Sequence, residues 1–122
     1  MKACIKPGAA AHEYYFDEGC FITELSNGPN DPAVSVARAR LPPGQTTRWH
    51  FLRGTGERYV VLAGEGLVEI GDLPPHRLGA GDVVVIPPGS RQRIANTGDV
   101  DLVFLAICSP RFSPAVYVDI DE

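Results

Sequence analysis

The chain has 122 residues, of which 44% are hydrophobic and 21% charged, and its formal net charge is -4. This length and composition predict one folded domain that buries roughly two-thirds of its unfolded surface, and they exclude a disordered chain. The basic residues form no cluster and no apolar run is long enough to cross a bilayer, so we expect neither a nucleic-acid partner nor a membrane partner.

The 13 glycines and 11 prolines fall between short apolar runs, which is typical of short strands joined by turns. The segment 83–86 is entirely β-branched, so we expect it to be buried on both faces or nearly so. No segment has helical periodicity. In chain order, the expected strands cover residues 21–25, 34–41, 45–52, 57–62, 67–70, 83–86, 92–95 and 101–108, with a further short one at 116–118 in the proline-punctuated tail 109–122. The prediction is one all-β domain over residues 1–122, built as a barrel or a two-sheet jelly roll.

Two stretches place polar side chains at set intervals behind a glycine. In the first stretch Gly44 precedes His50, Glu57 and Gly64, and in the second Gly81 precedes Pro87, Gly89, Gln92 and Asn96. This spacing resembles the two sequence boxes of the cupin superfamily, G-x5-H-x-H-x4-E-x6-G at residues 44–64 and G-x5-P-x-G-x2-H-x3-N at residues 81–96. The resemblance implies the cupin double-stranded β-helix, a jelly-roll barrel. The glycines themselves fit strand ends where a tight turn needs positive φ.

The departures from the cupin pattern concern the metal ligands. Of the four ligand positions usual in cupins, His50 and Glu57 are intact, whereas Leu52 and Gln92 stand where the family has histidines. The resemblance therefore implies a weak divalent site of His50, Glu57 and Gln92, for zinc, nickel, manganese or iron. One nitrogen and two oxygens fall short of the triad that non-haem iron oxygenases use. Isomerase, cyclase or lyase chemistry suits such a site better than oxygenation.

Each proposed ligand also has a role without a metal. His50 can be a core histidine bonded to a neighbouring oxygen, and Glu57 can be a general base or the ion-pair partner of Arg48. Gln92 can hold a substrate or a neighbouring side chain through its amide. These alternatives stay open at the level of sequence.

Strand alternation adds four residues to the expected pocket. Arg48 and Leu52 share a face with His50, Tyr59 shares one with Glu57, and Ile94 shares one with Gln92. We expect these four to contact the ligand: Arg48, Leu52, Tyr59 and Ile94. A salt bridge at the barrel mouth is the alternative for Arg48, and core packing is the alternative for Tyr59.

The remaining signals concern assembly and location. Trp49 has the opposite parity to His50 and faces outward with Phe51, which predicts a covered surface and a homodimer; packing against another segment is the alternative. The three cysteines follow no disulfide or metal spacing, and Cys108 is expected to be a buried, inert thiol. Free thiols and an amino terminus without the apolar run of a signal peptide predict a cytoplasmic protein.

Two functions follow from these residues and from the resemblance. The first is a small metal-binding cupin that binds or acts on a sugar-, keto- or polyketide-like molecule. The second is a metal-free small-molecule binding module without catalytic activity. A barrel kept only for assembly is a third, weaker reading. The sequence assigns no catalytic residue, and the fold alone selects no activity.

Overall fold

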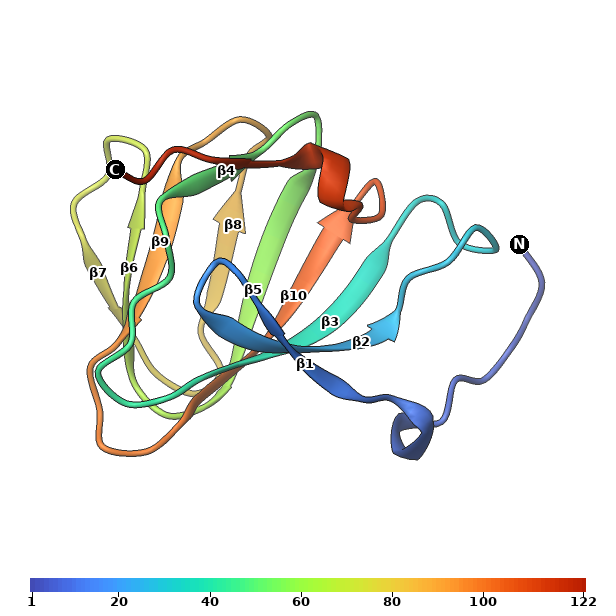
Figure 1. Cartoon of the computed structure of the whole chain (residues 1–122), viewed down its shortest axis with the longest axis horizontal. Helices are drawn as coiled ribbons and strands as arrows, with labels where there is room; N and C mark the ends of the chain where they lie inside the picture. Colours follow the sequence, from blue (N-terminus) through green and yellow to red (C-terminus); the bar gives the residue numbers. More distant parts are fainter.

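The computed structural model describes residues 1–122 and contains eleven strands and two single-turn 3-10 helices (Figure 1). Most of the strands lie where glycines and prolines bound the apolar runs of the sequence. The elements are η1 Gly8–Ala10, β1 Glu13–Phe16, β2 Cys20–Ser26, β3 Ser35–Leu41, β4 His50–Leu52, β5 Gly56–Ala63, β6 Gly66–Ile70, β7 His76–Leu78, β8 Val83–Ile86, β9 Gln92–Asn96, β10 Leu102–Ser109, η2 Pro114–Val116 and β11 Tyr117–Asp119.

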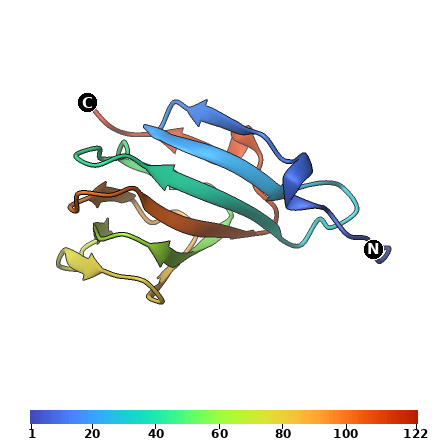
Figure 2. The ribbon, with the colours of Figure 1, turned by 90° about the horizontal axis from the view of Figure 1, so that it is seen from below.

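The strands form two antiparallel sheets that face each other. One sheet has six strands in the order β1-β2-β3-β10-β5-β8, and the other has five in the order β11-β4-β9-β6-β7. Figure 2 shows β1, β2, β3 and β10 side by side along one wall of the barrel. The predicted all-β, two-sheet architecture is confirmed. The strand expected at 45–52 is shorter, because only His50–Leu52 is continuous and Thr46 forms an isolated bridge to Ala95.

The core lies between the two sheets and consists of inward residues from both. A cluster of 13 buried side chains includes Leu41, Val61, Ile86, Ile94 and Leu102. In β2, β3, β5, β8 and β10 two members of the cluster lie two positions apart, because the pleat sends alternate residues to the same face. The site described below occupies the end of the barrel next to this cluster.

The expectation that residues 83–86 are buried on both faces is wrong. Val84 and Ile86 are buried, but Val83 and Val85 are 59% and 65% exposed. The reason is topological, since β8 is an edge strand of the six-stranded sheet and only its inner face meets the core. A run of β-branched residues indicates a strand here without indicating how many of its faces are covered.

The four box glycines named above have positive φ, as their turns predict. Gly64 is the most constrained, because a Cβ there would lie 2.5 Å from the Asp101 carbonyl oxygen at φ +86. We expect Gly64→Ala to lower the free energy of unfolding by at least about 2 kcal/mol. Gly8→Ala, where a Cβ meets nothing within 4 Å, is the control and should change it by less than about 0.5 kcal/mol. Equal midpoints in urea for the two variants would contradict this reading of the turn.

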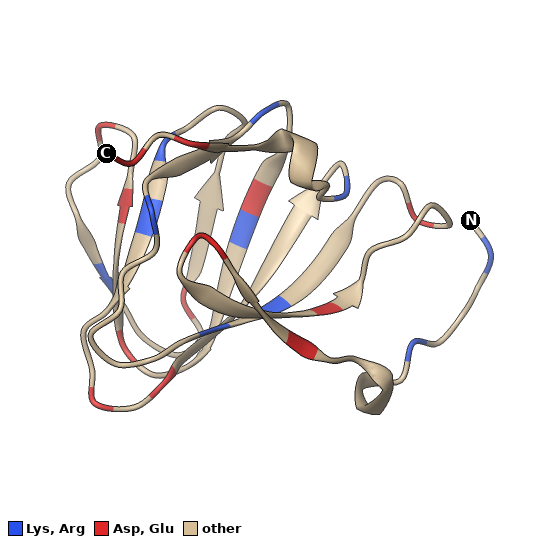
Figure 3. Ribbon diagram, viewed as in Figure 1, with Lys and Arg blue, Asp and Glu red and all other residues tan.

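The outer surface carries mixed charge. Basic segments are scattered over several elements rather than gathered on one face (Figure 3). Trp49 is half-buried between Arg91 and Arg93, whose guanidinium carbons lie 4.7 and 4.5 Å from its ring centroid. These arginines cover part of the outward tryptophan, and a homodimer stays a prediction. No helical segment of the structure has the length and apolar character needed to span a membrane.

Candidate functional site

The two sequence boxes meet where β4 pairs with β9. His50 and Gln92 are directly opposite each other in this pairing, and both side chains are almost fully buried. Tyr59, on β5 of the other sheet, donates its hydroxyl to Gln92 Oε1 at 2.5 Å. All three side chains are buried inside the barrel, the placement predicted from strand parity together with the cupin resemblance. Gln92 thus links the two sheets at the inner end of the site.

His50 is held at both ring nitrogens. Its Nδ1 lies 2.7 Å from the Arg48 carbonyl oxygen, which can only accept, so Nδ1 carries a proton. Its Nε2 lies 3.3 Å from Oε2 of Glu18. With Nδ1 protonated, a neutral ring would present a lone pair to the carboxylate. The ring is therefore fixed by the backbone at Nδ1 and faces Glu18 with Nε2.

Glu18 reaches His50 from the turn between β1 and β2. Gly19, at φ +107, makes the turn, and the Arg48 N–H donates to the Glu18 carbonyl at 2.7 Å. The Cys20 thiol donates to the second carboxyl oxygen of Glu18 at 3.0 Å. Burial raises the pKa of Cys20, so this thiol is a donor and not a nucleophile. The turn therefore places Glu18 as a carboxylate with both oxygens engaged.

The carboxyl-terminal tail closes the other side of the histidine. Tyr117, the first residue of β11, stacks on the His50 ring with a centroid distance of 4.8 Å and an interplanar angle of 24°. β11 pairs with β4 in antiparallel register. The short strand predicted at 116–118 is present one residue later, and its role is to fix the plane of the imidazole.

Glu57 is a buried carboxyl group with few partners. Its side chain is 8% exposed, Cys108 donates to its Oε2 at 3.6 Å, and its Oε1 has no hydrogen-bond partner. Burial, followed by the negative charge of Glu18, raises its pKa to about 8. Glu57 is therefore protonated at neutral pH. Burial also raises the pKa of Cys108, which agrees with the expected inert thiol.

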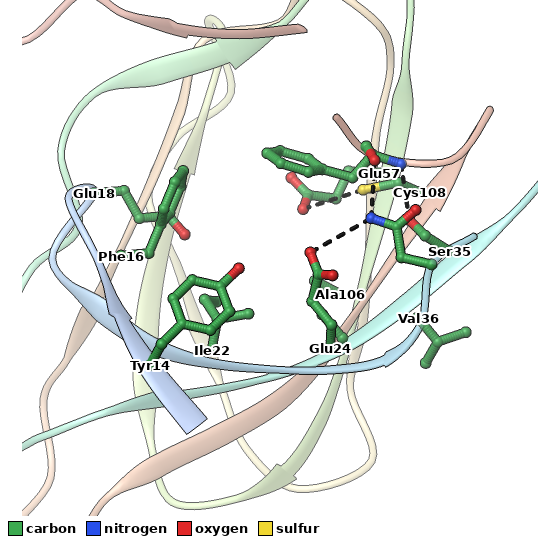
Figure 4. A pocket seen from close by; sticks show the side chains of 13 residues that line it. Tyr14, Phe16, Glu18, Ile22, Glu24, Ser35, Val36, Glu57, Ala106 and Cys108 are labelled. Atoms are coloured by element: carbon green, nitrogen blue, oxygen red, sulfur yellow. Dashed lines mark hydrogen bonds between the residues drawn. The ribbon is translucent and has the colours of Figure 1, made fainter. Parts of the chain in front are cut away.

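A cavity of about 60 Å³ lies between Glu18 and Glu57. Figure 4 shows the carboxyl groups of Glu18, Glu24 and Glu57 approaching it from different sides, with the Tyr14 hydroxyl also directed inward. Phe16, Ile22 and Ala106 are among the apolar residues of the wall. At about 15 Å³ for each water, the cavity has room for about four waters or a small molecule.

The other residues expected in the pocket lie elsewhere. Leu52, Tyr59 and Ile94 are buried to 3%, 4% and 0% exposure in the interior, and none of them lines the cavity. Arg48 is exposed and pairs with Asp119 at 2.6 Å, so the alternative ion pair between Arg48 and Glu57 does not form. The strand expected at 45–52 is irregular at Arg48, and parity fails there.

The proposed metal ligands do not form a complete set. No three histidine, cysteine or carboxylate side chains converge on one point. Gln92 Oε1 accepts the Tyr59 hydroxyl, and Glu57 faces Cys108 while His50 faces Glu18. Structural metal sites in proteins usually have four donors and catalytic ones three. Each of the three is thus in contact with another protein side chain, and a divalent site of His50, Glu57 and Gln92 stays a prediction.

Sequence reasoning missed Glu18, Glu24 and Tyr117. Glu18 lies in a turn, where alternation gives no direction, and nothing in its neighbourhood links it to His50. The Asp17-Glu18-Gly19 turn signal could have suggested a hairpin, and a hairpin at a barrel mouth often carries function. For Tyr117, the predicted strand was the available signal, but its pairing partner was not predictable.

Comparison with known proteins identifies the family. Residues 37–108 match the cupin domain. An oxalate-binding protein of Thermotoga maritima is 41% identical over 80 residues, which are 64% of this chain and 64% of that protein. The chain thus matches somewhat less than two-thirds of that relative's length.

Solved structures agree with the sequence match. The crystal structure of a predicted oxalate decarboxylase from Thermotoga maritima superposes with a TM-score of 0.78 and 26% identity, covering 88% of this chain and 99% of the other. A nucleoside dehydratase from Streptomyces superposes with a TM-score of 0.81 at 17% identity, covering 98% and 92%, and shows the fold alone. Both the two-sheet barrel and the family match lead to one conclusion: this chain is a member of the cupin family, with the double-stranded β-helix fold.

Proposed function

We propose that this cupin is a metal-independent acid–base enzyme that enolises a small polar carbonyl compound in the cavity between Glu18 and Glu57. The observation that carries the proposal is Glu57: a buried, protonated carboxyl group with an unpartnered oxygen at the cavity. Two carboxyl groups in unlike environments, one of them with a raised pKa, are a recurrent arrangement for acid and base roles.

The roles follow from the two environments. Glu18, held by His50 and Cys20, takes a proton from the carbon next to the carbonyl, and the electron pair of that C–H bond forms the enol double bond. Glu57 gives its proton to the carbonyl oxygen. In an isomerisation the former carbonyl carbon takes the proton back from Glu18, while the hydroxyl on the neighbouring carbon gives its proton to Glu57 and becomes the new carbonyl. In a dehydration a hydroxyl on the next carbon leaves as water with the proton from Glu18, and the enol O–H returns its proton to Glu57 as the carbonyl re-forms. His50 contacts Glu18 rather than the cavity, so it is a positioning residue.

The test is exchange of carbon-bound hydrogen with solvent deuterium. Small hydroxycarbonyl compounds, beginning with dihydroxyacetone, are incubated with the untagged protein in deuterated buffer and followed by NMR. Protein stripped with a chelator is compared with untreated protein whose metal content is measured. We expect exchange above the buffer rate, equal in both samples.

Two results would contradict the proposal. Exchange that disappears on chelation and returns with zinc, nickel, manganese or iron would show that the reaction needs a metal. It would then favour the weak metal site predicted at His50, Glu57 and Gln92. Absence of exchange with every compound would leave the second predicted function, a metal-free binding module.

A further inference from the structure

The cavity wall contains negative groups and no positive ones. Glu18, Glu24 and Glu57 line it, whereas no lysine or arginine does. Arg48 is turned outward to Asp119, and Arg58, next to Glu57 in sequence, is exposed and donates to the Ser109 hydroxyl. A negatively charged ligand entering this cavity would lose its hydration and meet the carboxyl groups of Glu18 and Glu24, with no basic side chain in the wall to pair with it.

Unpartnered oxygens indicate what the cavity takes instead. Glu57 Oε1 and Asn27 Oδ1 are both buried and have no hydrogen-bond partner, and both residues line the cavity. A buried polar oxygen without a hydrogen-bond partner costs free energy until a ligand supplies one. The Glu57 side chain is more than nine-tenths buried and is directed into the cavity, so this is a built site rather than a surface cluster of acids.

A cation gains little in this cavity. Glu57 offers the cavity a single oxygen, Oε1, because Cys108 donates to its Oε2 at 3.6 Å. Both oxygens of Glu18 are already engaged by Cys20 and His50, and Glu24 is exposed to water. The rest of the wall is largely apolar, with Phe16, Ile22 and Ala106 among its residues. An ammonium group would lose its hydration against this apolar wall and would find most of the buried carboxyl oxygens already taken by protein donors.

We propose that the cavity selects an uncharged carbonyl compound bearing hydroxyl groups, and excludes dicarboxylates such as oxalate, the ligand for which the Thermotoga relative is named. This substrate class rests on the proposed function and narrows it. Hydroxyl donors on the ligand satisfy Asn27 Oδ1 and Glu24, while the carbonyl oxygen accepts the proton of Glu57.

Three probes with the same number of non-hydrogen atoms separate charge from size. They are oxalate, which is a dianion, dihydroxyacetone, which is neutral, and 1,3-diaminoacetone, which is cationic near neutral pH. Binding to the full chain is measured by NMR titration or calorimetry at pH 7, without reference to turnover. We expect dihydroxyacetone to bind at least about tenfold more tightly than either charged probe. Oxalate binding as tight as that of dihydroxyacetone, or preferred binding of the diamine, would overturn the inference.

A charge reversal at the cavity tests the electrostatic reason. Glu24→Lys, an exposed position, places a cation at the cavity and should raise oxalate affinity about tenfold or more. Glu65→Lys, at the exposed turn between β5 and β6, changes the net charge equally and should leave oxalate affinity unchanged. An equal rise in both variants would show that only net charge matters, which contradicts the inference.

These measurements separate the two proposals. Binding of dihydroxyacetone without deuterium exchange would support the proposed ligand class and contradict the proposed enzymatic activity. Deuterium exchange, together with oxalate binding as tight as that of dihydroxyacetone, would support the enzymatic activity and contradict the proposed ligand class.

Discussion

Raising the pH from about 5 to about 8 should lower the free energy of unfolding of this protein, and Glu57→Gln should abolish most of that loss. The pKa of Glu57 is raised from the usual 4.5 to about 8 in the folded protein, chiefly by burial. Between these values the folded state holds a proton that the unfolded state has released. The free energy of unfolding therefore falls with rising pH, by up to about 1.4 kcal/mol for each pH unit.

The two proteins should be nearly equally stable at about pH 3.5, below the usual pKa of 4.5, where the carboxyl group is protonated in both the folded and the unfolded states. At pH 8 the variant should be more stable by a few kcal/mol, since glutamine is uncharged at every pH. Urea unfolding curves at half-unit steps of pH give the comparison. Glu65→Gln, in an exposed turn, is the control and should follow the native curve.

Parallel pH curves for native protein and Glu57→Gln would show that Glu57 is ionised when folded, with its charge compensated. A bound cation would do this, so that outcome would also weaken the metal-independent mechanism. The cavity would then be anionic at its inner end, and the preference for an uncharged ligand would lose one of its supports.

The prediction of the fold from sequence succeeded because its signals are local. Gly44, Gly64, Gly81 and Gly89 mark turns that only glycine adopts without strain, and short apolar runs between them make strands. The burial of individual residues was harder to predict from the sequence. Val83 and Val85 are exposed because β8 is an edge strand, and an edge is a property of the assembled sheet.

For the site, strand parity predicted the buried positions of His50, Glu57 and Gln92 but not the partners that determine their chemistry. Glu18 contacts His50 across 32 positions of sequence, through a turn where alternation says nothing. Tyr117 contacts the same ring from the opposite terminus. Both lie outside residues 37–108, the part of the chain that matches the cupin domain. The segments that complete the site are thus those about which the family pattern says least.

Glu18→Gln should reduce deuterium exchange at least about a hundredfold, the lower range for loss of a general base. Glutamine keeps the shape of the side chain and can still accept from Cys20, but it cannot take a proton from the substrate. The turn should keep its conformation, because Gly19 and the Glu18 carbonyl bond to Arg48 depend on the backbone.

Asp17→Asn removes the same charge one residue earlier in the turn, at an exposed position, and is the matched control. It should retain exchange within about twofold. His50→Gln should lower the rate less than Glu18→Gln and move the lower limb of the pH–rate profile, because its effect reaches the substrate only through Glu18. A native rate in Glu18→Gln, with loss only in His50→Gln, would instead make the histidine the base. The catalytic group would then be one of the two intact ligand positions of the family pattern, and the β1–β2 turn would serve only to hold it in place.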